Sequence, residues 1–166
     1  MKVTNVYDIN DYVSMNDNVA SIHGYVVLTD EDGKTLFKKH NMIVEAGREV
    51  IKNAVLNCIF NGDSTNFPKF KAIKFGNNND ITRSSDGNLR GDSIITSKNT
   101  STIDGDNTRC IKITTKISSD TSTVISEAGI FLENDKKEEV MFSRVAFAPL
   151  TIRTGTEYTL NYYIYF

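Results

Sequence analysis

Hydrophobic and polar residues alternate with a period of two over most of this chain, and that period is typical of β-strands. The segment 30–33 (DEDG) interrupts the first such stretch with turn-forming residues, which predicts a β-hairpin. Pro149 breaks the pattern late in the chain. The expected strands are 22–29, 34–40, 70–76, a short strand at 93–98, 109–117, 123–131, 140–147 and 156–166.

Between residues 46 and 60 the apolar positions recur at three- and four-residue spacing instead, which indicates one amphipathic α-helix. The segment 61–63 (NGD) ends it, since Asn or Gly readily adopts the left-handed conformation of a helix cap. We expect the helix to lie across a sheet on its apolar face, which consists of Val50, Ile51, Ala54, Val55, Cys58 and Ile59.

Seven or eight strands at hairpin spacing with one helix predict a mainly β fold, an antiparallel β-sandwich of jelly-roll-like type. Residues 21–166 form its single domain. Residues 1–20 are polar with few apolar positions, so we expect an N-terminal arm that gains order from a neighbouring subunit. The segment 76–108 is rich in Gly, Asn, Asp, Ser and Thr, which predicts a long functional or mobile loop.

The composition excludes several classes of protein. The 166 residues include 19 basic and 21 acidic side chains, and no basic run is present that would attract nucleic acid. No apolar stretch approaches the roughly 20 residues that cross a bilayer, so we expect no membrane insertion. Cys58 and Cys110 match no metal-binding spacing and are expected to be buried free thiols.

The search for catalytic chemistry gives no nucleophile motif, and we expect no enzymatic activity, no metal and no cofactor. The acidic segments 30–33 and 104–107 lack the further ligands of a calcium loop and are interpreted as turns. With the hairpin turn centred on residues 31 and 32, His23 falls opposite His40. No third metal ligand accompanies them, so they are interpreted as ordinary sheet residues.

Glu127 is a lone acid in an otherwise apolar strand, where an unpaired charge is costly. A hairpin turn near residues 134–137 would place Glu127 directly opposite Arg144. The sequence therefore predicts a partly buried structural ion pair between the two side chains.

Three segments resemble small structural proteins of tailed bacteriophages and of phage-tail-like bacteriocins from low-GC Gram-positive bacteria. The most specific is 125–131 (ISEAGIF) followed by 141–150 (MFSRVAFAPL) and a terminal strand. The others are 33–34 with 41–48 (NMIVEAGR), and 73–78 (IKFGNN) with Asp86 and Leu89 downstream. Asn78 stands where a second Gly is usual in the family, and the terminal strand has Tyr where Trp is common.

The resemblance implies a non-enzymatic virion component that assembles symmetrically in the tail baseplate or fibre attachment. Its partners would be copies of itself and other particle proteins, with assembly in the bacterial cytoplasm and later release in the particle. The alternatives are a collar or capsid-surface protein, a carbohydrate-binding module that contacts host glycans, and a small hydrolase.

Tyrosines in the terminal strand are the candidate interface residues, because Tyr buries a large ring and keeps a polar tip. Tyr162, Tyr163 and Tyr165 are the expected anchors, on the premise that a terminal strand can add to a neighbour's sheet. Alternation places Leu160, Tyr162, Ile164 and Phe166 on one face, so Tyr163 and Tyr165 are the two expected to touch a partner.

Overall fold

The computed structural model describes residues 22–166 apart from 64, 66, 98–101 and 108–109, and for residues 102–107 it describes only the backbone. The N-terminal arm expected at 1–20 lies outside the described residues. One α-helix, α1 (Glu45–Val55), continues into a single π-helical turn, η2 (Leu56–Phe60). The strands are β1 (His23–Thr29), β2 (Thr35–Ile43), β3 (Lys69–Gly76), β4 (Ser93–Ser97), β5 (Thr102–Asn107), β6 (Cys110–Ile117), β7 (Thr123–Glu133), β8 (Glu139–Ile152) and β9 (Tyr158–Tyr165).

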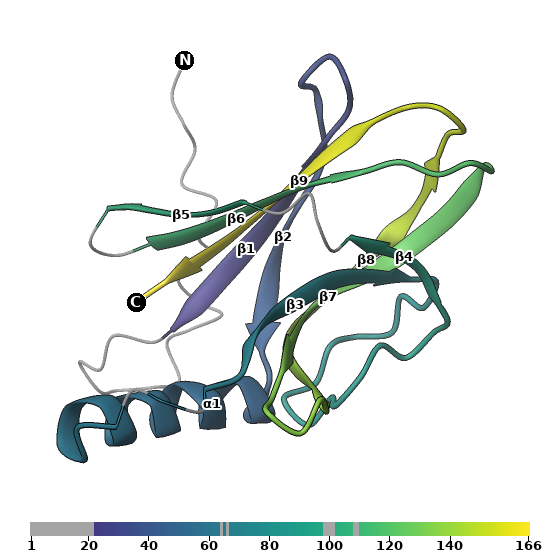
Figure 1. Ribbon diagram of the computed structural model, residues 1–166. Coiled ribbons are helices and arrows are strands. Elements are labelled where there is room, and N and C mark those ends of the chain that lie inside the picture. The colour runs from purple at the N-terminus through teal and green to yellow at the C-terminus, as the bar shows by residue number, and fades with distance from the viewer. Residues whose placement is uncertain (1–21, 64, 66, 98–101, 108–109) are drawn as a thin grey trace.

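The strands form one nine-stranded sheet in the order β4-β3-β7-β8-β2-β1-β9-β6-β5. All of its strand pairs are antiparallel. The sheet curls strongly, so that its two halves diverge from the β2–β8 junction and face each other (Figure 1). The expected mainly β, antiparallel fold with one helix is confirmed, whereas a jelly-roll sandwich of two separate sheets is not.

The hydrophobic core fills the space between the two halves of the curled sheet. Val26, Leu160 and Tyr162 enter it from the β1–β9 half, and Phe75 and Ile130 enter it from the β3–β7 half; all five are at most 1% exposed. Across the open side of the curl, the hydroxyl of Ser97 in β4 hydrogen-bonds the hydroxyl of Thr115 in β6. The sheet thus closes over its core without joining its edge strands into a barrel.

The predicted hairpin is present, but its register differs from the expected one. His40 lies opposite Tyr25, not opposite His23. The register shifts between Leu28 and Thr29 next to the turn, and a count from a symmetrical turn cannot foresee such a bulge. The proposed juxtaposition of the two histidines was therefore wrong.

The predicted helix occupies the expected residues, and Gly62 follows it with a positive φ of 66°. Only the first half of the helix lies against the sheet. Gly47 approaches the backbone of Phe142 so closely that a Cβ on Gly47 would lie 2.2 Å from the carbonyl oxygen of Phe142. Ile51, one turn further along, packs on the core. The second half leaves the sheet, and Cys58 is exposed rather than buried. Cys110 is buried, as expected.

Pro149 does not end a strand, because β8 continues through it to Ile152. In the neighbouring strand β7, Ile125 pairs with Leu150 and Glu127 pairs with Ala146. Residues 147–149 of β8 therefore form a bulge that includes Pro149. A bulge is the position in a sheet that tolerates proline, since no ladder hydrogen bond is required from its nitrogen.

The loop that links β3 to β4, residues 77–92, packs on the face of β7 and β8 that points away from the core. Leu89 from this loop packs beside Phe131, Met141 and Val44 in a second, smaller cluster. The loop is therefore a built part of the fold that covers one outer face of the sheet.

Candidate functional site

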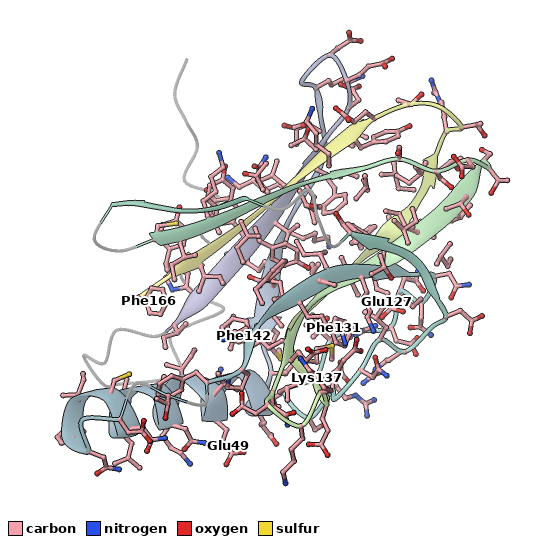
Figure 2. The ribbon with its side chains drawn as sticks, in the orientation of Figure 1. Glu49, Glu127, Phe131, Lys137, Phe142 and Phe166 are labelled. Atoms are coloured by element: carbon pink, nitrogen blue, oxygen red, sulfur yellow. The ribbon has the colours of Figure 1, made fainter. Side chains whose placement is uncertain are left out.

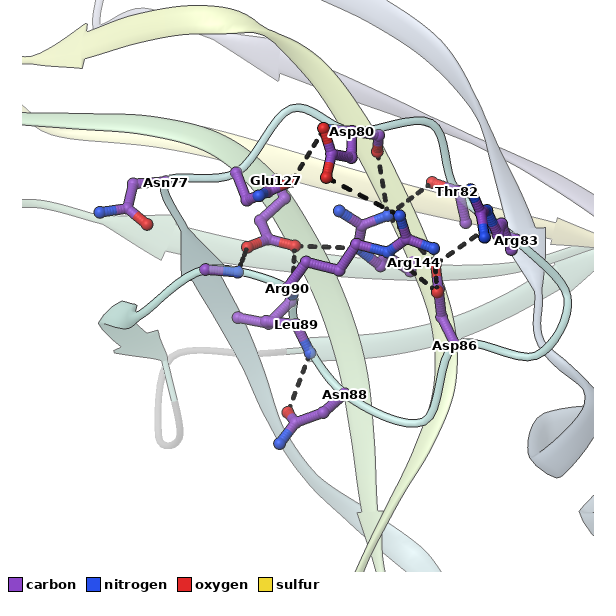
Figure 3. A network of polar contacts seen from close by, with 12 residues as sticks. Asn77, Asp80, Thr82, Arg83, Asp86, Asn88, Leu89, Arg90, Glu127 and Arg144 are labelled. Carbon is purple, nitrogen blue, oxygen red and sulfur yellow. Dashed lines mark hydrogen bonds and ion pairs between the residues drawn. The ribbon is translucent and has the colours of Figure 1, made fainter.

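Beneath the 77–92 loop lies a buried network of charged side chains, shown in Figure 3. Nε of Arg144 donates a hydrogen bond to Oε2 of Glu127 over 2.8 Å, and both side chains are 0% exposed. The loop completes the site: the backbone N–H of Arg90 donates to Oε2 of Glu127 over 3.0 Å, and that of Gly91 donates to Oε1 over 2.7 Å. The predicted ion pair is present, and it is fully rather than partly buried.

The strand register that led to this ion pair was not the observed one. Glu127 pairs with Ala146 and Arg144 pairs with Gly129, so the two charged residues lie diagonally across β7 and β8. The pairs next to the turn, such as Glu133 with Glu139, are already one residue off the sequence estimate, and the bulge in β8 between Met141 and Ser143 adds a second residue. A diagonal arrangement still brings them together, since both side chains are long enough to span it.

The guanidinium of Arg144 also holds the first half of the loop. Its Nη1 donates to the carbonyl oxygen of Asp80 and to Oδ2 of Asp86, each over 3.1 Å, and to the hydroxyl of Thr82 over 3.4 Å. One strand residue thus fastens three loop positions.

Asp86 is the second acid of this network, and its side chain is 7% exposed. Burial alone would raise the pKa of Asp86, but hydrogen bonds from the Arg83 N–H and the Arg90 side chain, with the charges of Arg144 and Arg90, lower the pKa overall. The Arg90 contact is forked, with Nη2 at 2.7 Å and Nε at 3.0 Å from Oδ1. The network therefore stabilises the ionised form of Asp86.

The hydrogen bonds of this network clamp the 77–92 loop to strands β7 and β8. Glu127 accepts bonds on both oxygens and Asp86 does the same. Sequence reasoning assigned no role to the Asp86 and Arg90 contact, because a loop has no periodicity from which a partner can be inferred.

A row of stacked aromatic rings lies on the opposite half of the sheet, on the outer face of β1 and β9. We call His23, Tyr25, Tyr163 and Tyr165 the aromatic face. The ring centroids of Tyr25 and Tyr163 are 4.5 Å apart, those of Tyr25 and Tyr165 are 5.7 Å apart, and those of His23 and Tyr165 are 5.4 Å apart, all in stacked geometry. The alternation expected for the last strand is confirmed, since Tyr163 and Tyr165 are only half-buried.

Two positive charges flank the aromatic face. Nζ of Lys38 lies 4.5 Å from the ring centroid of Tyr25, and Nζ of Lys112 lies 5.8 Å from that of Tyr163. Lysines over the rings of tyrosines form cation–π contacts, which leave the face both aromatic and basic.

Two expectations about the terminal strand were wrong. Tyr162 is 0% exposed and belongs to the core, so it cannot anchor a partner. Strand β9 pairs with β1 on one side and β6 on the other, so it offers no free edge for another chain. Phe166 follows the last strand residue, Tyr165, and is 46% exposed. Strand order is set by long-range pairing that the local pattern does not encode.

The second half of the helix carries an apolar surface that the described residues leave uncovered. We call Val55, Leu56, Ile59 and Phe60 the helix end; they are 44%, 47%, 71% and 73% exposed. Figure 2 shows this part of the helix extending away from the strands with its side chains drawn outward. Large apolar side chains gathered in this way are typical of protein interaction sites.

Within the part of the chain that the structure describes, no three His, Cys, Asp or Glu side chains form a group suited to a metal ion. The described helices include none with the length and apolar character needed to cross a membrane. Comparisons with protein-family models, curated proteins and solved structures give no match.

Proposed function

We propose that this protein is a non-enzymatic structural component of a phage or phage-tail-like particle and acts by binding other protein subunits, including copies of itself. The proposed location is the tail baseplate or the fibre attachment. The helix end is the observation that carries the binding role, because four large apolar side chains face solvent there. The particle assignment draws on the sequence resemblance of the segments around 125–131 and 141–150.

The occupant that we propose for the helix end is the helix end of a second copy. In an antiparallel pair related by a two-fold axis beside residues 57 and 58, Val55 of each copy would lie near Phe60 of the other, and Leu56 near Ile59. Each helix end would thus bury its apolar side chains against an identical surface.

The helix end is too small to be the whole interface. A standard interface uses about 20–30 residues on each side, so more of the surface must take part. The aromatic face supplies a second contact region, with Tyr163 and Tyr165 as its proposed anchors. Aromatic residues are enriched among the side chains that dominate binding energy.

Carbohydrate binding is the second candidate, and the aromatic face is the observation that favours it. Sugar rings stack on exposed faces of aromatic rings. Here the rings stack on one another within 18–19° of parallel at Tyr25, so their faces are partly covered. The hydroxyls of Tyr25 and Tyr165 also hydrogen-bond each other over 3.3 Å. This geometry suits a protein partner better than a sugar, and a glycan array separates the two.

The test of the proposed function is the composition of the particle. Particles induced from the strain that encodes this chain are purified on a density gradient and analysed by mass spectrometry. We expect the protein at a stoichiometry fixed relative to the other tail components. Absence of the protein from intact particles would overturn the assignment. Removal of the protein by a mild salt wash would overturn it as well, because the protein would then be adsorbed to the particle and not built into it.

A further inference from the structure

A groove with a cavity volume of about 650 Å³ opens where strand β2 parts from β8. Only Met42 and Ile43 of β2 pair with β8, at Arg144 and Ser143, so the strands diverge beyond them. The walls come from both strands, the start of β1, the start of α1 and the loop segment 79–82. The groove therefore runs between two strands that no longer pair with each other.

An unsatisfied amide lies in the wall of this groove. Asn41 is 5% exposed, and neither its Nδ2 nor its Oδ1 has a hydrogen-bond partner among the described residues. Buried polar groups are almost always paired, so an unpaired amide in the wall of a groove points to a partner from outside those residues. Oδ1 lies against Gly24 and both amide atoms are buried, so a ligand reaches them when the side chain turns toward the groove. A side-chain amide offers one donor group and one acceptor, which matches the N–H and C=O of a peptide backbone.

The remaining polar groups of the groove are basic or neutral. Lys39 and Arg48 line it, and His23 and His40 lie beside them, whereas none of the described residues in the wall is an Asp or a Glu. Nε of Arg48 is held by the carbonyl oxygen of Ile43 at 3.3 Å, which fixes the position of the guanidinium. Apolar side chains such as Ile81 and Phe147 form the rest of the lining.

From these observations we propose that the groove binds an extended acidic peptide of a partner protein. Asn41 binds its backbone, Lys39 and Arg48 bind its carboxylates, and the apolar lining receives its alternate side chains. Extended peptides commonly bind beside strands in this way, with backbone hydrogen bonds for affinity and pockets for specificity. The inference rests on the proposed function in that it names the chemistry of one particle partner.

The test measures binding of labelled peptides to the full chain by fluorescence anisotropy. The probe is acetyl-Val-Asp-Val-Asp-Val-Asp-Val-amide, and its control has Asn in place of each Asp. We expect saturable binding of the acidic peptide, and binding of the Asn peptide weaker by about tenfold or more. Equal affinity for both peptides would overturn the proposal, as would binding of inorganic phosphate without binding of the acidic peptide.

Variants locate the binding in the groove. Lys39→Gln, Arg48→Gln and Asn41→Leu should each weaken binding of the acidic peptide severalfold, while Lys34→Gln in the exposed β1–β2 turn should leave it unchanged. If Asn41→Leu fails to fold, the two exposed basic positions still decide the result. Unchanged affinity in both would contradict the proposal. The assay needs no particle, so its failure is distinct from absence of the protein from particles.

Discussion

Arg144 and Glu127 face each other with a 2.8 Å hydrogen bond between Nε and Oε2, and neither side chain contacts solvent. The two residues belong to different strands, and each also binds the 77–92 loop. Glu127 accepts hydrogen bonds from two backbone N–H groups of the loop. Arg144 donates hydrogen bonds to Asp80, Thr82 and Asp86. The ion pair thus links the sheet to the loop that covers it.

Replacement of Arg144 by Ala should lower the free energy of unfolding by about 3–5 kcal/mol, because it leaves Glu127 charged and buried without its partner. Urea denaturation followed by circular dichroism measures this value. Lys116→Ala is the matched control, since Lys116 and Glu157 form an ion pair whose side chains are 57% and 55% exposed; it should cost about 0–1 kcal/mol. A loss at Arg144 no larger than at Lys116 would contradict a stabilising role for the buried pair.

The lowered pKa of Asp86 predicts a dependence of stability on pH. A carboxylate whose pKa is lower in the folded state adds stability above its unfolded pKa, and this is lost as the pH falls through the folded pKa. The difference in unfolding free energy between wild type and Asp86→Asn should therefore be full at neutral pH and shrink once the pH drops below about 4.

Urea titrations at several pH values measure this difference. Asp135→Asn, in the exposed β7–β8 turn, controls for the loss of one negative charge. A difference for Asp86→Asn that is constant from neutral to acid pH would show that the carboxylate charge contributes nothing.

The close approach of the loop to the ion pair can be tested at a glycine. A Cβ on Gly91 would lie 2.3 Å from Oδ1 of Asn77 and 3.0 Å from Oε1 of Glu127, so Gly91→Ala must displace the loop. We expect a loss of about 1–3 kcal/mol in unfolding free energy. Gly87, in the same loop, has no atom within 4 Å of such a Cβ, and Gly87→Ala should change stability by less than about 0.5 kcal/mol. Equal effects at the two glycines would argue against the tight contact.

Periodicity predicted the helix and eight of the nine strands, because burial on one face imposes it on the sequence. It missed β5, where residues 104–107 were expected to form a turn. The alternation in β9 correctly separated Tyr163 and Tyr165 from Leu160 and Ile164. The same pattern could not place β9 between β1 and β6, since strand order depends on contacts between residues far apart in the chain.

The charged network was predictable only where a residue broke a pattern. Glu127 stood out against its apolar strand, and its partner followed from hairpin geometry, although the position of the turn and one bulge in β8 together moved the register by two residues. Asp86 and Arg90 lie in a loop, where no local rule ties one side chain to another. The helix pattern does not show where the sheet stops, so Val55 and Ile59 were expected to be covered, although both are exposed.

The proposed self-association through the helix end predicts the behaviour of charged variants. Ile59→Glu with Phe60→Glu should abolish concentration-dependent association, because glutamates cannot be buried against a second apolar helix end. Sedimentation velocity over a range of protein concentrations measures this. Stability should be little affected, since both side chains are more than 70% exposed. Lys34→Glu, in the β1–β2 turn, is the control; association that persists in the double variant would contradict the proposed contact.

An electron-microscopy map of the assembled particle is the decisive measurement, because it shows which surfaces of this chain touch other subunits. We expect the helix end, Val55, Leu56, Ile59 and Phe60, to be covered by a second copy and Tyr163 and Tyr165 to contact a neighbouring chain. A map in which the helix end and both tyrosine rings face solvent, far from any other subunit, would overturn the proposed function.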